Sequence, residues 1–372
     1  MKFLHLSDLH IGIRVNEMSM LPDQEHILAQ IIDIAAVEKP DAVIIAGDIY
    51  DKTVPPAEGV ALFDRFLTCL VEKRLPVFII SGNHDCAERV AFGNHLMHLA
   101  GVHISSAFSG EVENIRLTDG FGAVRIWLLP FIKPATVRRF FPETEIVTYN
   151  DAVRAVCDSM PLDDNERNVL ICHQFITGAV ASDSEQTTVG GLDNVDATLF
   201  DQFDYVALGH IHKPQTVLRP EVRYCGTPLK YSFSEADSKK SVTVVDLNQK
   251  GDVKITEKPL VPLHDMREIK GRFDEIMAYD KSEDYLRIIL TDEGDIPDAV
   301  AKIRGVFPNI MRLDYDNSRT RSAAVFCAAA DADNKSPAEL FGELYEMQMG
   351  AEMTDEQRKI IDDMICEIWE GE

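Results

Sequence analysis

Short apolar segments that run directly into histidine- and aspartate-bearing loops constrain this chain more than any other feature. Each segment is rich in Val, Ile or Leu and only four or five residues long, which is typical of a buried strand followed by a loop. A sheet built from such strands brings their loops together at one edge. The five segments are FLHL before SDLH, AVIIA before GDIYD, VFII before SGNHD, NVLI before CHQF, and YVAL before GHIH.

Helical patterns separate the early strands. Residues 23–37 and 57–73 carry apolar positions at helical spacing. After residue 205 the chain becomes strand-rich, with RYCGTPLKY and SVTVVDL. This alternation favours an α/β fold in which helices cover the strands. We therefore predict one α/β domain over residues 1–250.

Residues 251–327 show a second pattern, which predicts a small α+β unit that caps the first domain. MREI, YLRIIL and NIMRLDY are typical of strands, and FDEIMAY and PDAVAKIRGVF are typical of the helices between them. Residues 328–335, rich in Ala and Asp, then predict a linker.

Residues 336–372 predict a tail of two helices. Ser336 and Glu339 form a capping box with Pro337 at the first helical position, and Thr354 with Gln357 repeats the box. The second helix carries an apolar row on an acidic background. That row consists of Ile360, Ile361, Met364, Ile365, Ile368 and Trp369.

The charge balance limits what the chain can bind by itself. It has 62 acidic and 37 basic side chains, a formal net charge of −25 at pH 7. Because phosphate neutralisation dominates nucleic-acid binding, a duplex would need a partner, a local basic patch or bound cations. No apolar segment is long enough to span a membrane, and the N-terminus lacks a signal-peptide core. Seven cysteines without C-x-x-C spacing fit free thiols in a reducing cytoplasm.

Five of the eleven histidines fall in the loops that follow the predicted strands. Carboxylates and one amide accompany them in the same loops. Five separate loops that bring the same ligand chemistry to one sheet edge indicate a metal site rather than isolated turns. The candidate residues are Asp8, His10, Asp48, Asn83, His84, Asp85, His173, His210 and His212.

The spacing within these loops also suits metal binding. Asp8 and His10 are two residues apart, so in extended chain both side chains point the same way, and His210 and His212 repeat this spacing. Asp48 in a tight turn could bridge two ions. Mixed nitrogen and oxygen ligands suit Mn, Fe or Zn better than Ca or Mg. Two such ions are the usual apparatus for in-line attack on a phosphate ester.

The remaining histidines have simpler interpretations. His5 lies inside a predicted strand and is expected in the core. The others are expected to be surface groups or to support the site from behind its ligands. These are His26, His95, His98, His103 and His264.

The order D-x-H, G-D, G-N-H-D, a lone H and G-H-x-H resembles the calcineurin-like metallophosphoesterase superfamily. The finer wording is similar to the bacterial SbcD family, the nuclease subunits of SbcCD complexes. The matching stretches include AGDIYDKTVPP, ALGHIHKPQ, YCGTPLKYSFSEADSKKSVTVVDL and SPAELFGELYEMQMGAEMTDEQRK. The resemblance implies a four-layer αββα sandwich with a small capping domain and a helical tail.

The resemblance also implies roles for the candidate residues. One ion would be bound by Asp8, His10, Asp48 and His212, and the other by Asp48, Asn83, His173 and His210. His84 matches the catalytic histidine of the family, and Asp85 would orient it. Asp51 stands where archaeal and eukaryotic relatives have a histidine, so it is left out of the predicted site.

The activity implied is that of an Mn²⁺-dependent DNA nuclease with two metal ions. It would degrade double-stranded ends 3′ to 5′ and cut single strands and hairpins. The partner implied is an SbcC-type coiled-coil ATPase, on which the tail would dock. A homodimer within a heterotetramer, in the cytoplasm with the nucleoid, completes this expectation.

Two other functions fit parts of the sequence. The first is a metallophosphoesterase of small nucleotides or phosphoproteins, which the metal site alone does not exclude but which does not need an amphipathic two-helix tail. A neighbouring gene for a long coiled-coil ATPase would discriminate between them. The second is a scaffold with a vestigial site, which the intact ligand positions and His84 argue against.

Overall fold

The computed structural model describes residues 1–185, 194–294, 296–318 and 320. Further along, it describes 341, 342, 345, 353, 354, 357–361 and 364, so the predicted tail helices and linker lie largely outside the described residues. The chain divides into two compact units. The first comprises Met1–Glu268, Lys281–Arg287 and Phe307–Arg312, and the second comprises Ile269–Asp280, Ile288–Val306 and residues from Leu313 onward.

The first of two six-stranded sheets in the larger unit has the order β14-β13-β1-β4-β5-β6. Strands β1, β4, β5 and β6 are parallel, so their carboxyl ends share one edge, whereas β13 and β14 run antiparallel. The bounds are β1 Lys2–Leu6, β4 Ala42–Ala46, β5 Val77–Ile80, β6 Val102–Ser105, β13 Ser241–Leu247 and β14 Val253–Pro259. This sheet therefore extends past the boundary expected after residue 250.

The second sheet has the order β11-β12-β10-β9-β8-β7. Strands β8, β9, β10 and β12 are parallel, and the register of β9 with β10 sets His173 beside Gly209. The bounds are β7 Glu113–Asp119, β8 Gly122–Leu129, β9 Arg167–His173, β10 Tyr205–Gly209, β11 Gln215–Val217 and β12 Arg219–Tyr224. A small hairpin of β2 (Arg14–Val15) and β3 (Met18–Ser19) stands apart from both sheets.

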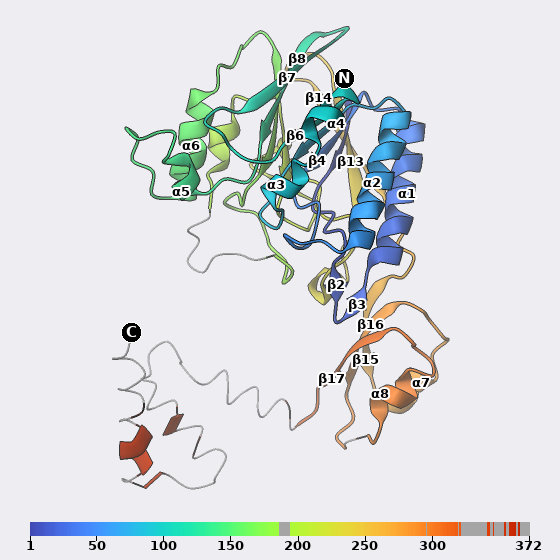
Figure 1. Ribbon diagram of the computed structural model, residues 1–372. Helices are drawn as coiled ribbons and strands as arrows, with labels where there is room; N and C mark the ends of the chain where they lie inside the picture. The colour runs from blue at the N-terminus through green and yellow to red at the C-terminus, as the bar shows by residue number, and fades with distance from the viewer. Residues whose placement is uncertain are drawn as a thin grey trace. The chain divides into compact units, whose positions relative to one another are not determined.

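The two sheets pack face to face, with helices on their outer faces (Figure 1). A core of residues from both sheets, such as Phe3, Phe78 and Leu128, lies between them. Helices α1 (Leu21–Glu38) and α2 (Ala57–Glu72) cover the first sheet, and α6 (Tyr149–Ser159) and the 3₁₀ turn η1 (Ala197–Phe200) cover the second. The predicted four-layer αββα architecture is confirmed.

Local sequence explains these elements. The central parallel strands are buried on both faces, so they are apolar throughout instead of alternating. Helix α2 is amphipathic, with Leu62, Phe66 and Leu70 recurring on its buried face. Helix α6 begins with a capping box in which Thr148 and Asp151 bond each other's backbone amides. Shorter helical turns are α3 Ala87–Val90, α4 Asn94–Leu99, α5 Pro134–Val137 and η2 Phe233–Glu235.

A three-stranded sheet of order β15-β16-β17 follows in sequence. Its elements match the five segments predicted as strands and helices after residue 265. They are β15 Met266–Gly271, α7 Phe273–Met277, β16 Tyr285–Leu290, α8 Ala299–Ile303 and β17 Ile310–Tyr315. Among the helices described, none is long and apolar enough to cross a membrane.

Candidate metal centre

The loops after the parallel strands bring the predicted ligands together. Asp8 follows β1 and Asp48 follows β4 in the first sheet, while His173 ends β9 and His210 follows β10 in the second. Acidic and imidazole groups from both sheets form three overlapping clusters, in each of which the ligand atoms lie within 4.8 Å of one another. The edge where the two sheets meet is therefore rich in metal-ligand chemistry.

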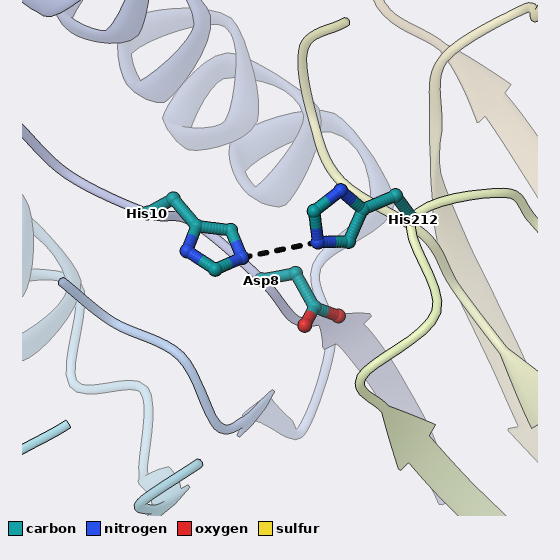
Figure 2. A group of neighbouring side chains, drawn as sticks. All are labelled: Asp8, His10 and His212. Atoms are coloured by element: carbon teal, nitrogen blue, oxygen red, sulfur yellow. Dashed lines mark hydrogen bonds between the residues drawn. The ribbon is translucent and has the colours of Figure 1, made fainter. Parts of the chain in front are cut away.

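The first cluster contains Asp8, His10 and His212, all buried (Figure 2). The Nε2 atoms of His10 and His212 lie 3.1 Å apart, although these residues are 202 positions apart in sequence. The Asp8 carboxylate also accepts the His210 backbone amide, at 3.0 and 3.1 Å for its two oxygens. The two D-x-H and G-H-x-H loops are thus joined directly.

The second group of contacts surrounds Asn83. Its Oδ1 lies 3.0 Å from His173 Nε2 and 2.9 Å from His210 Nδ1. The Asp48 carboxylate stands between the groups, because its Oδ2 is 3.3 Å from His173 Nε2 and 3.8 Å from His10 Nε2. Asp48 thus places one oxygen close to histidines of both predicted ligand sets.

The donor set fits divalent cations. Two neutral imidazoles whose Nε2 atoms face each other form a hydrogen bond only if one of them carries its proton there, and a cation between them would use both lone pairs. His173 already has a partner for Nδ1, the Ala46 carbonyl at 2.8 Å, which leaves its Nε2 for a ligand. Oxygen and nitrogen donors in this mixture suit Mn, Fe or Zn.

Backbone strain is concentrated at these residues. Asp8, His10, Asp48 and His210 have φ values of 52°, 43°, 49° and 102°, in the left-handed region that non-glycine residues seldom adopt. Such conformations persist only where the surroundings enforce them, and they gather at functional sites. Here the Asp8 amide donates to the Gly47 carbonyl and the His10 amide to the Asp48 carbonyl, each at 3.0 Å.

Glycine at position 82 allows the loops to approach each other. A Cβ added there would lie 2.1 Å from the Asp48 Oδ1 atom, inside any permitted contact. Gly47 has a φ of +87°, and its Cβ would lie 2.3 Å from His173 Nδ1. The G-D and G-N-H-D motifs therefore need their glycines so that the side chains of Asp48 and His173 fit against the neighbouring backbone.

His84 and Asp85 behave differently from the expectation. The sequence predicts that Asp85 orients His84, but the Asp85 carboxylate accepts the backbone amides of Gly82 at 2.9 Å, Tyr50 at 3.1 Å and Ile49 at 3.2 Å. The His84 ring instead donates from Nδ1 to the Asp51 carbonyl at 2.9 Å. That prediction is wrong because three amides of the two adjacent loops converge on the Asp85 oxygens.

The contact of Asp51 with His84 uses its backbone. Any residue at position 51 could supply that carbonyl, so the departure from the family's histidine leaves the support of His84 intact. His84 also joins His10 and Asp48 in one of the three clusters. Its backbone amide donates to Asp48 Oδ1 at 2.9 Å, which ties the G-N-H-D loop to the central carboxylate.

The electrostatics of the centre reflect burial of many polar groups together. Burial raises the pKa of the Asp8 carboxyl to about 6, against the opposing effect of His173 and His212. Burial lowers the pKa of His10 well below its usual range. Burial also acts to raise the pKa of Asp48, but His173 outweighs it and holds that pKa below its usual value. Asp48 is therefore the firmest anion of the group.

The other histidines lie where expected. His5 is buried in β1, with its Nδ1 2.9 Å from the Tyr205 hydroxyl, which confirms a core position. His264 is half-buried and bonds Asp23 at 3.1 Å. The sequence did not single out Ser184 or Glu185, which contact His212. A lone serine and glutamate in a loop carry no pattern that would mark them.

Comparison with known proteins adds the family. The profile described as calcineurin-like phosphoesterase matches residues 1–214, and one described as type 5 capsule protein repressor C-terminal domain matches residues 262–349. The SbcD polypeptide of the nuclease SbcCD from Staphylococcus epidermidis is 33% identical over 333 residues, covering 87% of this chain and 88% of that protein. The chain belongs to the SbcD family of nuclease subunits. The SbcD-family protein of the same name from Staphylococcus saprophyticus is 31% identical, covering 84% of each chain.

Membership in the SbcD family makes the chain a metal-dependent phosphodiesterase with a calcineurin-like fold. Among solved structures, a dimetal phosphatase from Danio rerio is 10% identical and covers 70% of this chain and 95% of its own, with a TM-score of 0.42. That likeness is too low to support a conclusion about the site.

Proposed function

We propose that this chain is the Mn²⁺-dependent nuclease subunit of an SbcCD-type complex. It degrades double-stranded DNA ends 3′ to 5′ and cuts single strands and hairpins. The observation that supports this most is the gathering of Asp8, Asp48, His173 and His212 in mutually close, buried clusters at the edge shared by both sheets. This edge is where phosphodiester hydrolysis would take place.

The proposed ligand sets share Asp48. Asp8, His10 and His212 complete one set, and Asn83, His173 and His210 complete the other. When bound, two cations supply charge that binds the scissile phosphate and lowers the pKa of an attacking water. Asp48 fixes the spacing between the sets, since its Oδ2 is within 3.8 Å of imidazole nitrogens of both.

His84 is the proposed proton donor. Its Nδ1 is held by the Asp51 carbonyl at 2.9 Å, so the ring has a fixed orientation and Nε2 is the nitrogen left to give a proton to the departing 3′-oxygen. Asp85 supports this role indirectly. By accepting three amides from the loops at Ile49 and Gly82, it keeps the loop that carries His84 against the loop that carries Asp48.

The partner and substrate follow from the charge and the family. A chain of net charge −25 needs help to hold a duplex at physiological salt. An SbcC-type coiled-coil ATPase would provide basic DNA-binding surface and couple ATP to access. The apolar row of the predicted tail, which lies largely outside the described residues, is the proposed docking segment.

Two copies of the chain are proposed to meet within this assembly. The region from α2 to α4 has exposed apolar side chains, among them Val60, Phe92, Leu96 and Leu99. A cavity of about 420 Å³, lined by Tyr50, Phe63 and Phe92 among others, opens beside them. This surface suits a homodimer within a heterotetramer, working in the cytoplasm with the nucleoid.

The test is a nuclease assay of the purified chain with Mn²⁺, with and without its ATPase, on linear, single-stranded and hairpin DNA. Asp48→Ala should reduce cleavage to background while the circular dichroism spectrum stays that of the wild type, because the apolar strands hold the sheets. A bis-p-nitrophenyl phosphate or cyclic nucleotide substrate cleaved in preference to every DNA would favour the alternative, a phosphoesterase of small nucleotides. Undiminished Mn²⁺-dependent cleavage by Asp48→Ala would contradict the site.

A further inference from the structure

The segment SFSEADSKK contains two charged residues that the chemistry above does not use. Glu235 and Lys240 form an ion pair whose side chains are only 1% and 3% exposed. Removing two charges from water costs several kcal/mol each, so buried pairs of this kind add little to stability beyond what apolar residues would give. Stability alone is therefore a weak reason for placing these charges inside the domain.

Both residues connect to the predicted ligand His212. Glu235 Oε1 accepts the Ser184 hydroxyl at 2.8 Å, and Ser184 Oγ lies 2.7 Å from His212 Nδ1. Lys240 Nζ donates to Glu235, to the His212 carbonyl at 2.9 Å and to Thr227 Oγ1 at 2.6 Å. The ring and the backbone of His212 are thus held by one connected network.

The direction of these hydrogen bonds decides the tautomer of His212. An ionised Glu235 paired with Lys240 can only accept, so the Ser184 hydroxyl donates to it. The lone pairs of that hydroxyl then accept from His212, which places the ring proton on Nδ1. His212 Nε2 is left unprotonated, at 3.1 Å from His10 Nε2, where the proposed metal ligands converge.

We infer that Glu235, acting through Ser184, and Lys240 are positioning residues that fix His212 as a cation ligand through Nε2. This inference rests on the proposed metal centre. It assigns a purpose to the charged part of the family-specific segment. It also predicts that the tautomer of His212 is set before any metal binds, because every group in the network belongs to the protein itself.

The experiment uses the full-length chain and the variants Ser184→Ala and Ser184→Thr. Ser232→Ala is the matched control, because the Ser232 hydroxyl lies in the same segment but bonds Ser234 Oγ at 2.8 Å instead of His212. Calorimetric titration with Mn²⁺ should show one of two sites weakened roughly 10- to 100-fold in Ser184→Ala, the usual cost of losing an outer hydrogen-bond partner of a ligand. Ser184→Thr, which keeps the hydroxyl, and the control should bind as the wild type does.

A second measurement does not depend on metal. Long-range ¹H–¹⁵N spectra of the metal-free chain should show the His212 proton on Nδ1 in the wild type and a mixture of tautomers in Ser184→Ala. A wild-type His212 protonated on Nε2, or wild-type Mn²⁺ affinity in Ser184→Ala, would overturn the inference. If Ser184→Ala does not fold, Glu235→Gln takes its place with the same expected outcomes. A wild type that binds no Mn²⁺ but shows the Nδ1 tautomer would count against the proposed function alone.

Discussion

Individual residues of the centre are held by more contacts than ligand chemistry requires. Asp8, for example, combines a left-handed backbone, an amide bond to Gly47 and a carboxylate that receives the His210 amide. Each constraint reduces the motion available to a side chain before a cation arrives, which is the meaning of preorganisation at a metal site. Variants of these residues should therefore be read by both metal affinity and turnover.

His84 offers the sharpest separation of those two readouts. Replacing it with Gln removes the proposed proton donor but none of the seven proposed ligands. We expect the rate of Mn²⁺-dependent cleavage to fall roughly 10²- to 10⁴-fold, the range typical of general acid–base groups, with unchanged Mn²⁺ affinity by calorimetry. A marked loss of affinity would instead make His84 a ligand, as its place in a cluster with His10 and Asp48 would then explain.

His5 gives the fold a dependence on pH that is separate from the metal centre. Burial, with the nearby Arg223, lowers the pKa of His5 from 6.5 to about 3. Between these values the unfolded chain takes up a proton that the folded chain does not. Stability is therefore complete above pH 6.5 and falls as the pH drops toward 3.

The variant His5→Gln has no such proton to bind. From pH 7 to pH 5, the wild type should lose about 2 kcal/mol of unfolding free energy relative to this variant, at ~1.4 kcal/mol per pH unit below 6.5. Urea unfolding followed by circular dichroism at both pH values measures the difference. Parallel losses in the two proteins would show that His5 is protonated in the folded state or that its unfolded pKa is unusually low.

At the scale of elements, the loops after β4 and β5 meet at Gly82. An added methyl group there would lie 2.1 Å from Asp48 Oδ1, so the loops would have to move apart. We expect Gly82→Ala to cost about 1–3 kcal/mol of stability, as overpacking usually does, and to abolish tight Mn²⁺ binding. Gly120→Ala is a matched control, since nothing lies within 4 Å of a Cβ at that position. Wild-type Mn²⁺ affinity in Gly82→Ala would show that the two loops adjust freely.

The strand-and-loop pattern explains how much could be predicted. Strands such as β4 and β9 are continuous apolar runs with polar ends, so both the elements and the convergence of His10 and His173 followed from the sequence. The role of Asp85 did not, because a carboxylate that accepts backbone amides looks the same in sequence as one that orients a ring. Strand β14 is only partly buried at the sheet edge, so its sequence gives no sign that it continues the first domain past residue 250.

At the scale of the whole molecule, the distribution of charge separates catalysis from substrate capture. Residues 331–372 contain 13 acidic and 3 basic side chains, so this segment repels DNA and cannot supply the missing affinity. The buried centre has the groups for phosphodiester hydrolysis, yet a chain of net charge −25 holds long duplexes poorly. Hydrolysis of short substrates and processing of duplex ends should therefore depend on different parts of the chain.

Truncation after Asn334 tests this separation. The proposed ligands and His84 all precede residue 213, so the truncated chain should keep Mn²⁺ binding and cleavage of short single strands. It should lose ATP-stimulated cleavage of duplex ends, because the apolar row from Ile360 to Trp369 can no longer dock on the ATPase. Six apolar anchors at about 1.5–3 kcal/mol each provide a large gross driving force, from which the cost of association is subtracted. A pull-down in which the truncated chain captures the full-length ATPase as tightly as the intact chain does would place the docking surface elsewhere and leave the tail a structural role.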